Sequence, residues 1–98
     1  MANKHIRVIT LQEPARTFFQ RAADAMRRMG WNVFRVEETF LEGSVSMSIW
    51  SWGEDIQMRQ VSNDQVELVS KCKLVTQVID FGRNRKNIDK ILAMMDQV

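Results

Sequence analysis

The stretch that decides the fold is PARTFFQRAADAMRRMG, residues 14–30, in which apolar side chains recur every three or four positions. Phe18 and Met26 fall on one side of a helix with 3.6 residues per turn, and the arginines fall mainly on the other side. Gly30 follows as a residue that adopts the left-handed conformation common at helix ends. These features predict an amphipathic helix over residues 15–29.

Strands are expected on both sides of this helix. Residues 5–10 alternate, with Ile6 and Val8 on one face and Arg7 on the other. Residues 31–38 are rich in valine and phenylalanine, which favour strands. The first half of the chain therefore predicts a strand, a helix and a second strand.

The middle of the chain predicts further strands joined by short turns. Residues 41–43 are expected to turn the chain into an alternating strand over residues 44–52. Two more strands are predicted over residues 56–61 and 66–72, with a polar hairpin turn at residues 62–65. Successive strands joined in this way pair antiparallel.

A second amphipathic helix ends the chain, starting near Gly82 and burying the side of Ile88 and Ile91. Because two helical stripes need a shared apolar surface, we predict one α+β domain over residues 1–98. Its expected architecture is a two-layer sandwich with an antiparallel sheet of four or five strands and both helices on one face, in the order β-α-β-β-β-β-α. A ferredoxin-like split arrangement is the second choice.

Composition narrows the class of protein. The chain is 45% hydrophobic and 27% charged with a net charge of +2, as expected of a globular domain and too balanced to indicate a polyanion partner. The single cysteine, Cys72, excludes an internal disulfide and fits a reducing compartment. Without an apolar run of about 20 residues or a signal region, we expect a cytoplasmic protein that does not enter membranes.

Residues with catalytic or metal-binding chemistry are scarce. One histidine, His5, and one cysteine cannot supply the clustered ligands of a metal site, and no cofactor motif is present. Glu37 and Glu38 are adjacent on a strand and point to opposite faces, so they do not form an acid–base pair. The sequence therefore favours a protein that is not an enzyme.

Two tryptophans mark a candidate interface. Trp50 and Trp52 lie two positions apart on the predicted strand and so share a face, opposite to Val45. If Val45 faces the helices, the indoles stand on the outer face as a stacking platform or a two-fold dimer interface. The alternative is a bulge near Ser51 that returns an indole to the core.

A basic cluster of Arg83, Arg85, Lys86 and Lys90 surrounds the start of the last helix, where free backbone N–H groups attract anions. The cluster is either an anion site or a solvated helix face. The candidate anion- or ligand-binding residues are Gly82, Arg83, Asn84, Arg85 and Lys86.

Three blocks resemble small bacterial α+β domains of uncharacterised function. These are S-W-G-E at residues 51–54, S-K at residues 70–71, and D-F-G-R-N at residues 80–84 followed by Asn87-Ile88. The second half is also distantly similar to another uncharacterised bacterial family with D-x-G-x-N-R before its last helix. The resemblance implies a fold and no activity.

The blocks also carry physical expectations. Glu54 is expected to pair with Lys71 or Arg83. Asp80 is a candidate helix cap. The motif residues form either a network that anchors the last helix on the sheet or a site for a small anion or nucleotide.

These observations favour a non-enzymatic module that binds a small ligand or a protein partner, with self-association into a dimer as one form. The first alternative is a nucleic-acid-binding module that uses the basic helix start, with Trp50 and Trp52 for stacking. The second alternative is a small enzyme without a recognisable motif.

Overall fold

The computed structural model describes residues 4–46, 53–73 and 82–96. Its elements follow the predicted order, strand, helix, four strands, helix, which confirms the α+β assignment. They are β1 (Lys4–Thr10), α1 (Ala15–Arg28), β2 (Asn32–Val36), β3 (Phe40–Val45), β4 (Glu54–Ser62), β5 (Gln65–Cys72) and α2 (Arg83–Met95).

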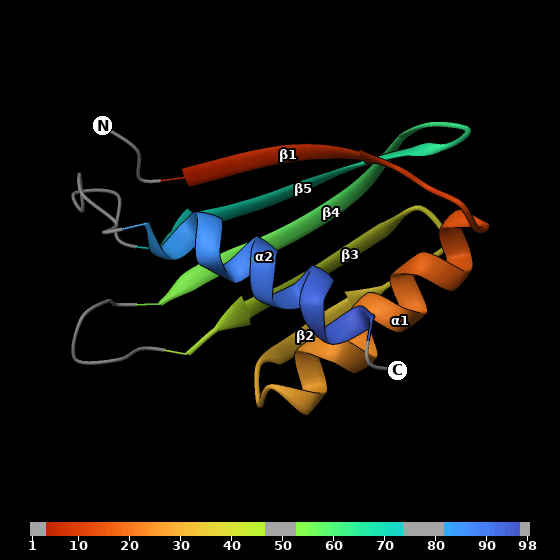
Figure 1. Cartoon of the computed structure of the whole chain (residues 1–98). Helices are drawn as coiled ribbons and strands as arrows, with labels where there is room; N and C mark the ends of the chain where they lie inside the picture. The colour runs from red at the N-terminus through yellow and green to blue at the C-terminus, as the bar shows by residue number, and fades with distance from the viewer. Residues whose placement is uncertain (1–3, 47–52, 74–81, 97–98) are drawn as a thin grey trace.

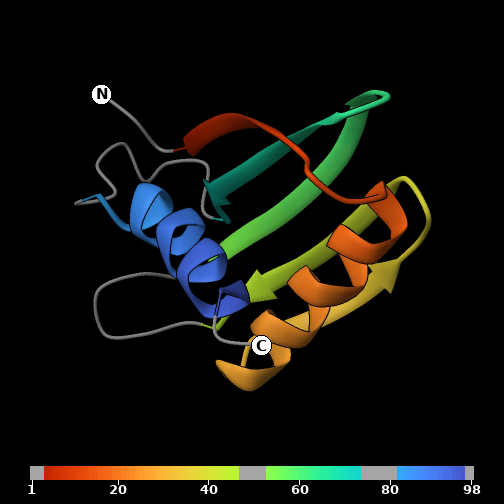
Figure 2. The same cartoon turned by 45° about the vertical axis from the view of Figure 1, so that its right-hand side comes forward.

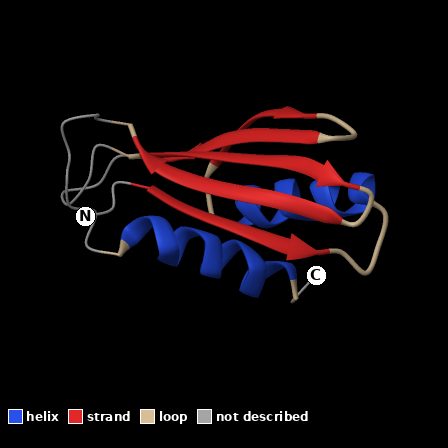
Figure 3. Ribbon diagram, turned by 90° about the horizontal axis from the view of Figure 1, so that it is seen from above, coloured by secondary structure: helices blue, strands red, loops and turns tan. Residues whose placement is uncertain are grey.

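The five strands form one antiparallel sheet in the order β1-β5-β4-β3-β2. Both helices cover the same face, with α2 packed on β5 and β1 and α1 packed on β2 and β3 (Figures 1 and 2). Figure 3 shows the resulting two layers, with strands on one side and helices on the other. The ferredoxin-like alternative is wrong, because β1 and β2 lie at opposite edges of the sheet.

The core forms between these layers because every element presents an apolar stripe to it. In α1 the predicted stripe is buried, and Gly30 has the expected left-handed backbone, with φ of 79°. The strands alternate, so their helix-facing side chains are buried while their neighbours lie on the other face. The fully buried apolar side chains include Phe19, Ala22, Met26, Leu41, Ile56, Met58, Val66, Leu68, Ile88 and Ile91.

The expected turn at residues 41–43 is wrong, since these residues lie inside β3. The chain turns earlier, where the Glu37 N–H donates to the Phe40 carbonyl at 2.7 Å. Gly43 serves close packing instead of a turn. A Cβ atom at this position would overlap the Asn32 carbonyl oxygen and lie 2.6 Å from Met26 Cε.

The strand predicted over residues 44–52 is described only over residues 44–46, and β3 ends at Val45, which is buried as expected. Ser44, predicted on the outer face, is also buried and accepts a hydrogen bond from Asn32 Nδ2 at 3.2 Å. Trp50, Trp52 and the bulge expected near Ser51 lie outside the described residues.

Gly43→Ala tests this close approach. The added methyl group forces the β2 backbone or the Met26 side chain to move, so we expect a loss of about 1–3 kcal/mol in unfolding free energy. Glu42→Ala, one residue earlier in β3, is the control and should change it by less than about 0.5–1 kcal/mol. Urea denaturation of both variants measures this. Equal losses would show that the packing around Gly43 is loose.

Candidate functional site

Four polar side chains are buried between the sheet and the start of α2. Glu54 comes from β4, Ser70 from β5, and Asn84 and Asn87 from α2. Glu54, Ser70 and Asn84 have no exposed surface, and Asn87 has 4%. Polar groups at this depth are stable only with hydrogen-bond partners, which these residues supply to one another.

Hydrogen bonds between the side chains link all four of these residues into one chain. The Ser70 hydroxyl donates to Asn84 Oδ1 at 2.7 Å. Asn87 Nδ2 donates to Ser70 Oγ at 3.1 Å and to Glu54 Oε1 at 2.9 Å. Because Asn84 and Asn87 are three residues apart, they share the helix face that meets the sheet.

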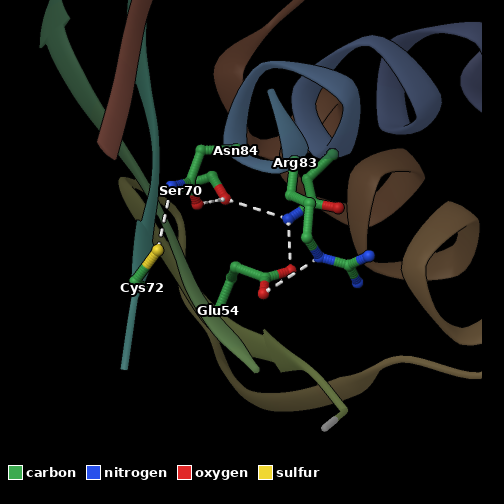
Figure 4. Close-up of polar contacts among 6 residues, drawn as sticks. Glu54, Ser70, Cys72, Arg83 and Asn84 are labelled. Carbon is green, nitrogen blue, oxygen red and sulfur yellow. Dashed lines mark hydrogen bonds and ion pairs between the residues drawn. The ribbon is translucent and has the colours of Figure 1, made fainter. Parts of the chain in front are cut away.

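Two further contacts complete this polar cluster (Figure 4). Arg83 Nε lies 3.4 Å from Glu54 Oε2, in an ion pair whose arginine is partly exposed. Asn84 Nδ2 contacts the buried Cys72 Sγ at 3.5 Å. We call Glu54, Ser70, Asn84, Asn87 and Arg83 the α2 anchor, because together they attach the first turn and a half of α2 to β4 and β5.

The three sequence blocks therefore meet in space. S-W-G-E contributes Glu54, S-K contributes Ser70, and the last block contributes the three α2 residues. Of the two expected pairings of Glu54, the one with Arg83 is present. The negative group held near the N-terminus of α2 is a carboxylate of the chain itself, where the helix dipole favours negative charge.

The five candidate anion-binding residues, Gly82 to Lys86, divide between two environments. Asn84 is buried and Arg83 forms an ion pair with Glu54, so both belong to the α2 anchor. Arg85 and Lys86 are exposed on the solvent side of α2. Gly82 precedes the helix with a left-handed φ of 77°, and its carbonyl accepts from the Lys86 N–H at 3.0 Å. The cap expected from Asp80 lies outside the described residues.

Neither of the two described helices lies on the opposite face of the sheet (Figure 3). Its side chains stand in rows across paired strands, and we call this surface the open face. Ile6 pairs with Val69, and Val8 pairs with Glu67, so two half-exposed apolar residues of β1 stand beside β5. The open face includes Lys4, Ile6, Val8, Glu67, Val69, Lys71, Asp55, Gln57, Arg59, Phe40, Glu42, Arg35 and Phe34.

Near β2 this face is hollowed and carries aromatic side chains. A shallow hollow of about 320 Å³ is lined by residues that include Phe34, Glu42 and Lys71. Phe34 is 61% exposed, and the guanidinium carbon of Arg35 lies 5.0 Å above the ring centroid of Phe40. Aromatic and arginine side chains of this kind are common energetic centres of protein interfaces.

The sequence predicted an interface on the outer face of the sheet through Trp50 and Trp52, but it did not identify Ile6, Val8 or Phe34 as part of that face. A local signal for it exists, because residues 5–10 place Ile6 and Val8 on the face opposite Ile9, so the strand is apolar on both sides. The apolar residues form one surface only because β1 pairs with β5, which places Val69 beside Ile6. No local sequence pattern specifies this pairing.

Comparison with known proteins adds no family. Neither the protein-family models nor the curated proteins compared give a match to this chain. Among the described residues, no three acidic, histidine or cysteine side chains gather closely enough to hold a metal ion. No helix within the described ranges is long and apolar enough to cross a membrane.

Asn87→Ala tests the α2 anchor. The change removes the hydrogen bond that Asn87 gives to the buried Glu54 carboxylate, and such bonds to charged groups contribute about 1.5–3 kcal/mol. Asn32→Ala is the matched control, because it removes a hydrogen bond between neutral groups at the sheet edge and should cost about 0.5–1.5 kcal/mol. Chemical denaturation compares them. A loss for Asn87→Ala no greater than for Asn32→Ala would contradict the anchor.

Proposed function

We propose that this protein is a non-enzymatic interaction module that binds a protein partner through its open face. The observation that carries the proposal is the sheet face that neither α1 nor α2 covers, on which Ile6, Val8 and Phe34 are 48%, 50% and 61% exposed. Both helices lie on the other side of the sheet (Figure 2). Exposed apolar groups collected on one face are typical of surfaces that a partner covers.

The charges on the open face favour a polypeptide partner over a polyanion. Arg59 forms an ion pair with Glu67 at 3.1 Å, and Asp55 stands across from Lys71 in the β4–β5 register. Positive and negative groups are thus interspersed around the apolar residues, as at the rim of a protein interface. A nucleic-acid surface instead presents one continuous positive sign.

The anchor supports the same proposal. It places Arg83 and Asn84 against the sheet, which leaves Arg85, Lys86 and Lys90 as the exposed members of the basic cluster. Three cations on one helix are a small electrostatic footprint for nucleic acid. The open face is broader and mixes apolar, aromatic and charged groups, which is the composition that polypeptide recognition uses.

Peptide selection followed by shift mapping tests the proposal. Random peptides displayed on phage are selected on the purified protein, and the selected peptides are titrated into an isotope-labelled sample. We expect backbone amide shifts on β1, β5 and β4. Ile6→Asp and Phe34→Asp should each weaken binding at least about tenfold, which corresponds to about 1.4 kcal/mol at a well-packed contact.

The helix-side variant Arg85→Glu/Lys86→Glu is the control and should leave peptide binding unchanged. A short single-stranded oligonucleotide is titrated into the same sample to examine the nucleic-acid alternative. Selected peptides that shift only α2 amides would overturn the proposal. Oligonucleotide shifts at residues 82–88 without any open-face binder would also overturn it.

A further inference from the structure

β1 is an edge strand with unusual exposure. Within the described part of the chain it pairs with β5 on one side and with no strand on the other. The other edge strand, β2, has five residues and a register shift between Val33 and Arg35, which disturbs its pairing edge. β1 has seven residues and an unbroken register, so it presents a regular row of backbone groups.

The direction of the β1 backbone groups follows from one hydrogen bond at its end. The Leu11 N–H donates to the Asp64 carbonyl at 2.6 Å, so the backbone of Leu11 faces β5. Because hydrogen-bonded and non-hydrogen-bonded positions alternate in antiparallel pairs, the odd-numbered residues of β1 also face β5. The backbone N–H and C=O groups that point away from the sheet therefore belong to Lys4, Ile6, Val8 and Thr10.

The Lys73–Gly53 contact gives the same assignment independently. The Lys73 N–H donates to the Gly53 carbonyl at 3.1 Å, so odd-numbered residues of β5 direct their backbone toward β4. The even-numbered residues of β5 then face β1, where Ser70 and Leu68 stand opposite His5 and Arg7.

From these positions we propose that β1 pairs antiparallel with β1 of a second copy of this chain, which joins the two sheets across a two-fold axis at Arg7. This register places Ile6 opposite Val8 of the second copy and Lys4 opposite its Thr10. It is the one register in which all four outward-facing residues of each strand find a partner. A shift by one residue sets outward groups against inward ones, and a shift by two leaves residues unpaired at the strand ends.

The side chains on the open face agree with this register. Ile6 and Val8 are 48% and 50% exposed in the single chain. Pairing sets each against the other in the second copy, so with Val69 from both copies one apolar strip crosses the axis. The cationic Lys4 meets the neutral Thr10, so this face opposes no like charges directly.

Charges on the helix side are already balanced. Arg7 meets Arg7 of the second copy at the axis, and each arginine carries its own counter-ion, Asp89 of α2, at 2.8 Å. The two arginines therefore stand side by side at the axis, each neutralised within its own chain. A second copy is favoured over an arbitrary extended peptide because Lys4, Ile6, Val8 and Thr10 lie symmetrically about Arg7, so a second β1 matches the whole edge.

This inference goes beyond the proposed function because it concerns the edge of the sheet and the self-partner, although Ile6 and Val8 serve both surfaces. Amide hydrogen exchange measured at micromolar and millimolar concentrations tests it residue by residue. At high concentration we expect exchange at Ile6, Val8 and Thr10 to slow at least tenfold. Exchange at Arg7 and Ile9, whose N–H groups already bond β5, should not change.

Sedimentation of matched variants completes the test. Ile6→Lys/Val8→Lys changes only exposed side chains and should remain folded and monomeric at millimolar concentration. Phe34→Lys, at the opposite edge, is the control and should dimerise like the wild type. Wild type that is monomeric throughout would overturn the inference, as would a dimer whose slowed amides lie elsewhere. Peptide binding is measured separately on the wild type at micromolar concentration, where its surface side chains are intact, so loss of the dimer leaves the proposed function to its own test.

Discussion

The buried carboxylate of Glu54 is the constraint on which the rest of the structure depends. Removing such a group from water is costly unless charge and hydrogen bonds are supplied inside the protein. The start of α2 supplies both, through Arg83 and Asn87, while Ser70 joins Asn87 to Asn84. Because the donors sit on the first turns of one helix, α2 must begin over the ends of β4 and β5, and α1 takes the remaining part of the same face.

Local patterns in the sequence predicted most of the helices and strands. Burying one face of a helix or strand requires apolar residues at the spacing of that element, and this spacing is visible in the sequence. The first helix, its glycine stop and the predicted strands at the start of the chain and over residues 56–61 and 66–72 are found, while most of the strand predicted over residues 44–52 lies outside the described residues. The error at residues 41–43 has a physical cause. A glycine is locally compatible with a turn, but Gly43 is required by the approach of Met26 and the Asn32 carbonyl, a contact that depends on how α1 crosses the sheet.

The candidate site was predictable only where residue types alone indicate a contact. The pairing of Glu54 with Arg83 follows from complementary charges, and it was one of two alternatives that the sequence left open. The division of the basic cluster was not predictable, since it depends on which helix face meets the sheet. The open face needs strand order as well, because Ile6 and Val69 are neighbours only after β1 joins β5. Non-local pairing of this kind leaves no local pattern. The anchor and the open face thus lie on opposite faces of the sheet, with polar groups hydrogen-bonded beneath α2 and half-exposed apolar groups on the other side.

A double-mutant cycle between Glu54 and Asn87 tests this account most directly. Unfolding free energies are measured for the wild type, Glu54→Ala, Asn87→Ala and the double variant. If the buried hydrogen bond at 2.9 Å positions α2, the two single losses will not add, and their coupling will be at least about 1 kcal/mol. The helix should also lose amide protection before the sheet in each variant. Losses that add to within about 0.3–0.5 kcal/mol would show that the two side chains act independently and would contradict the account.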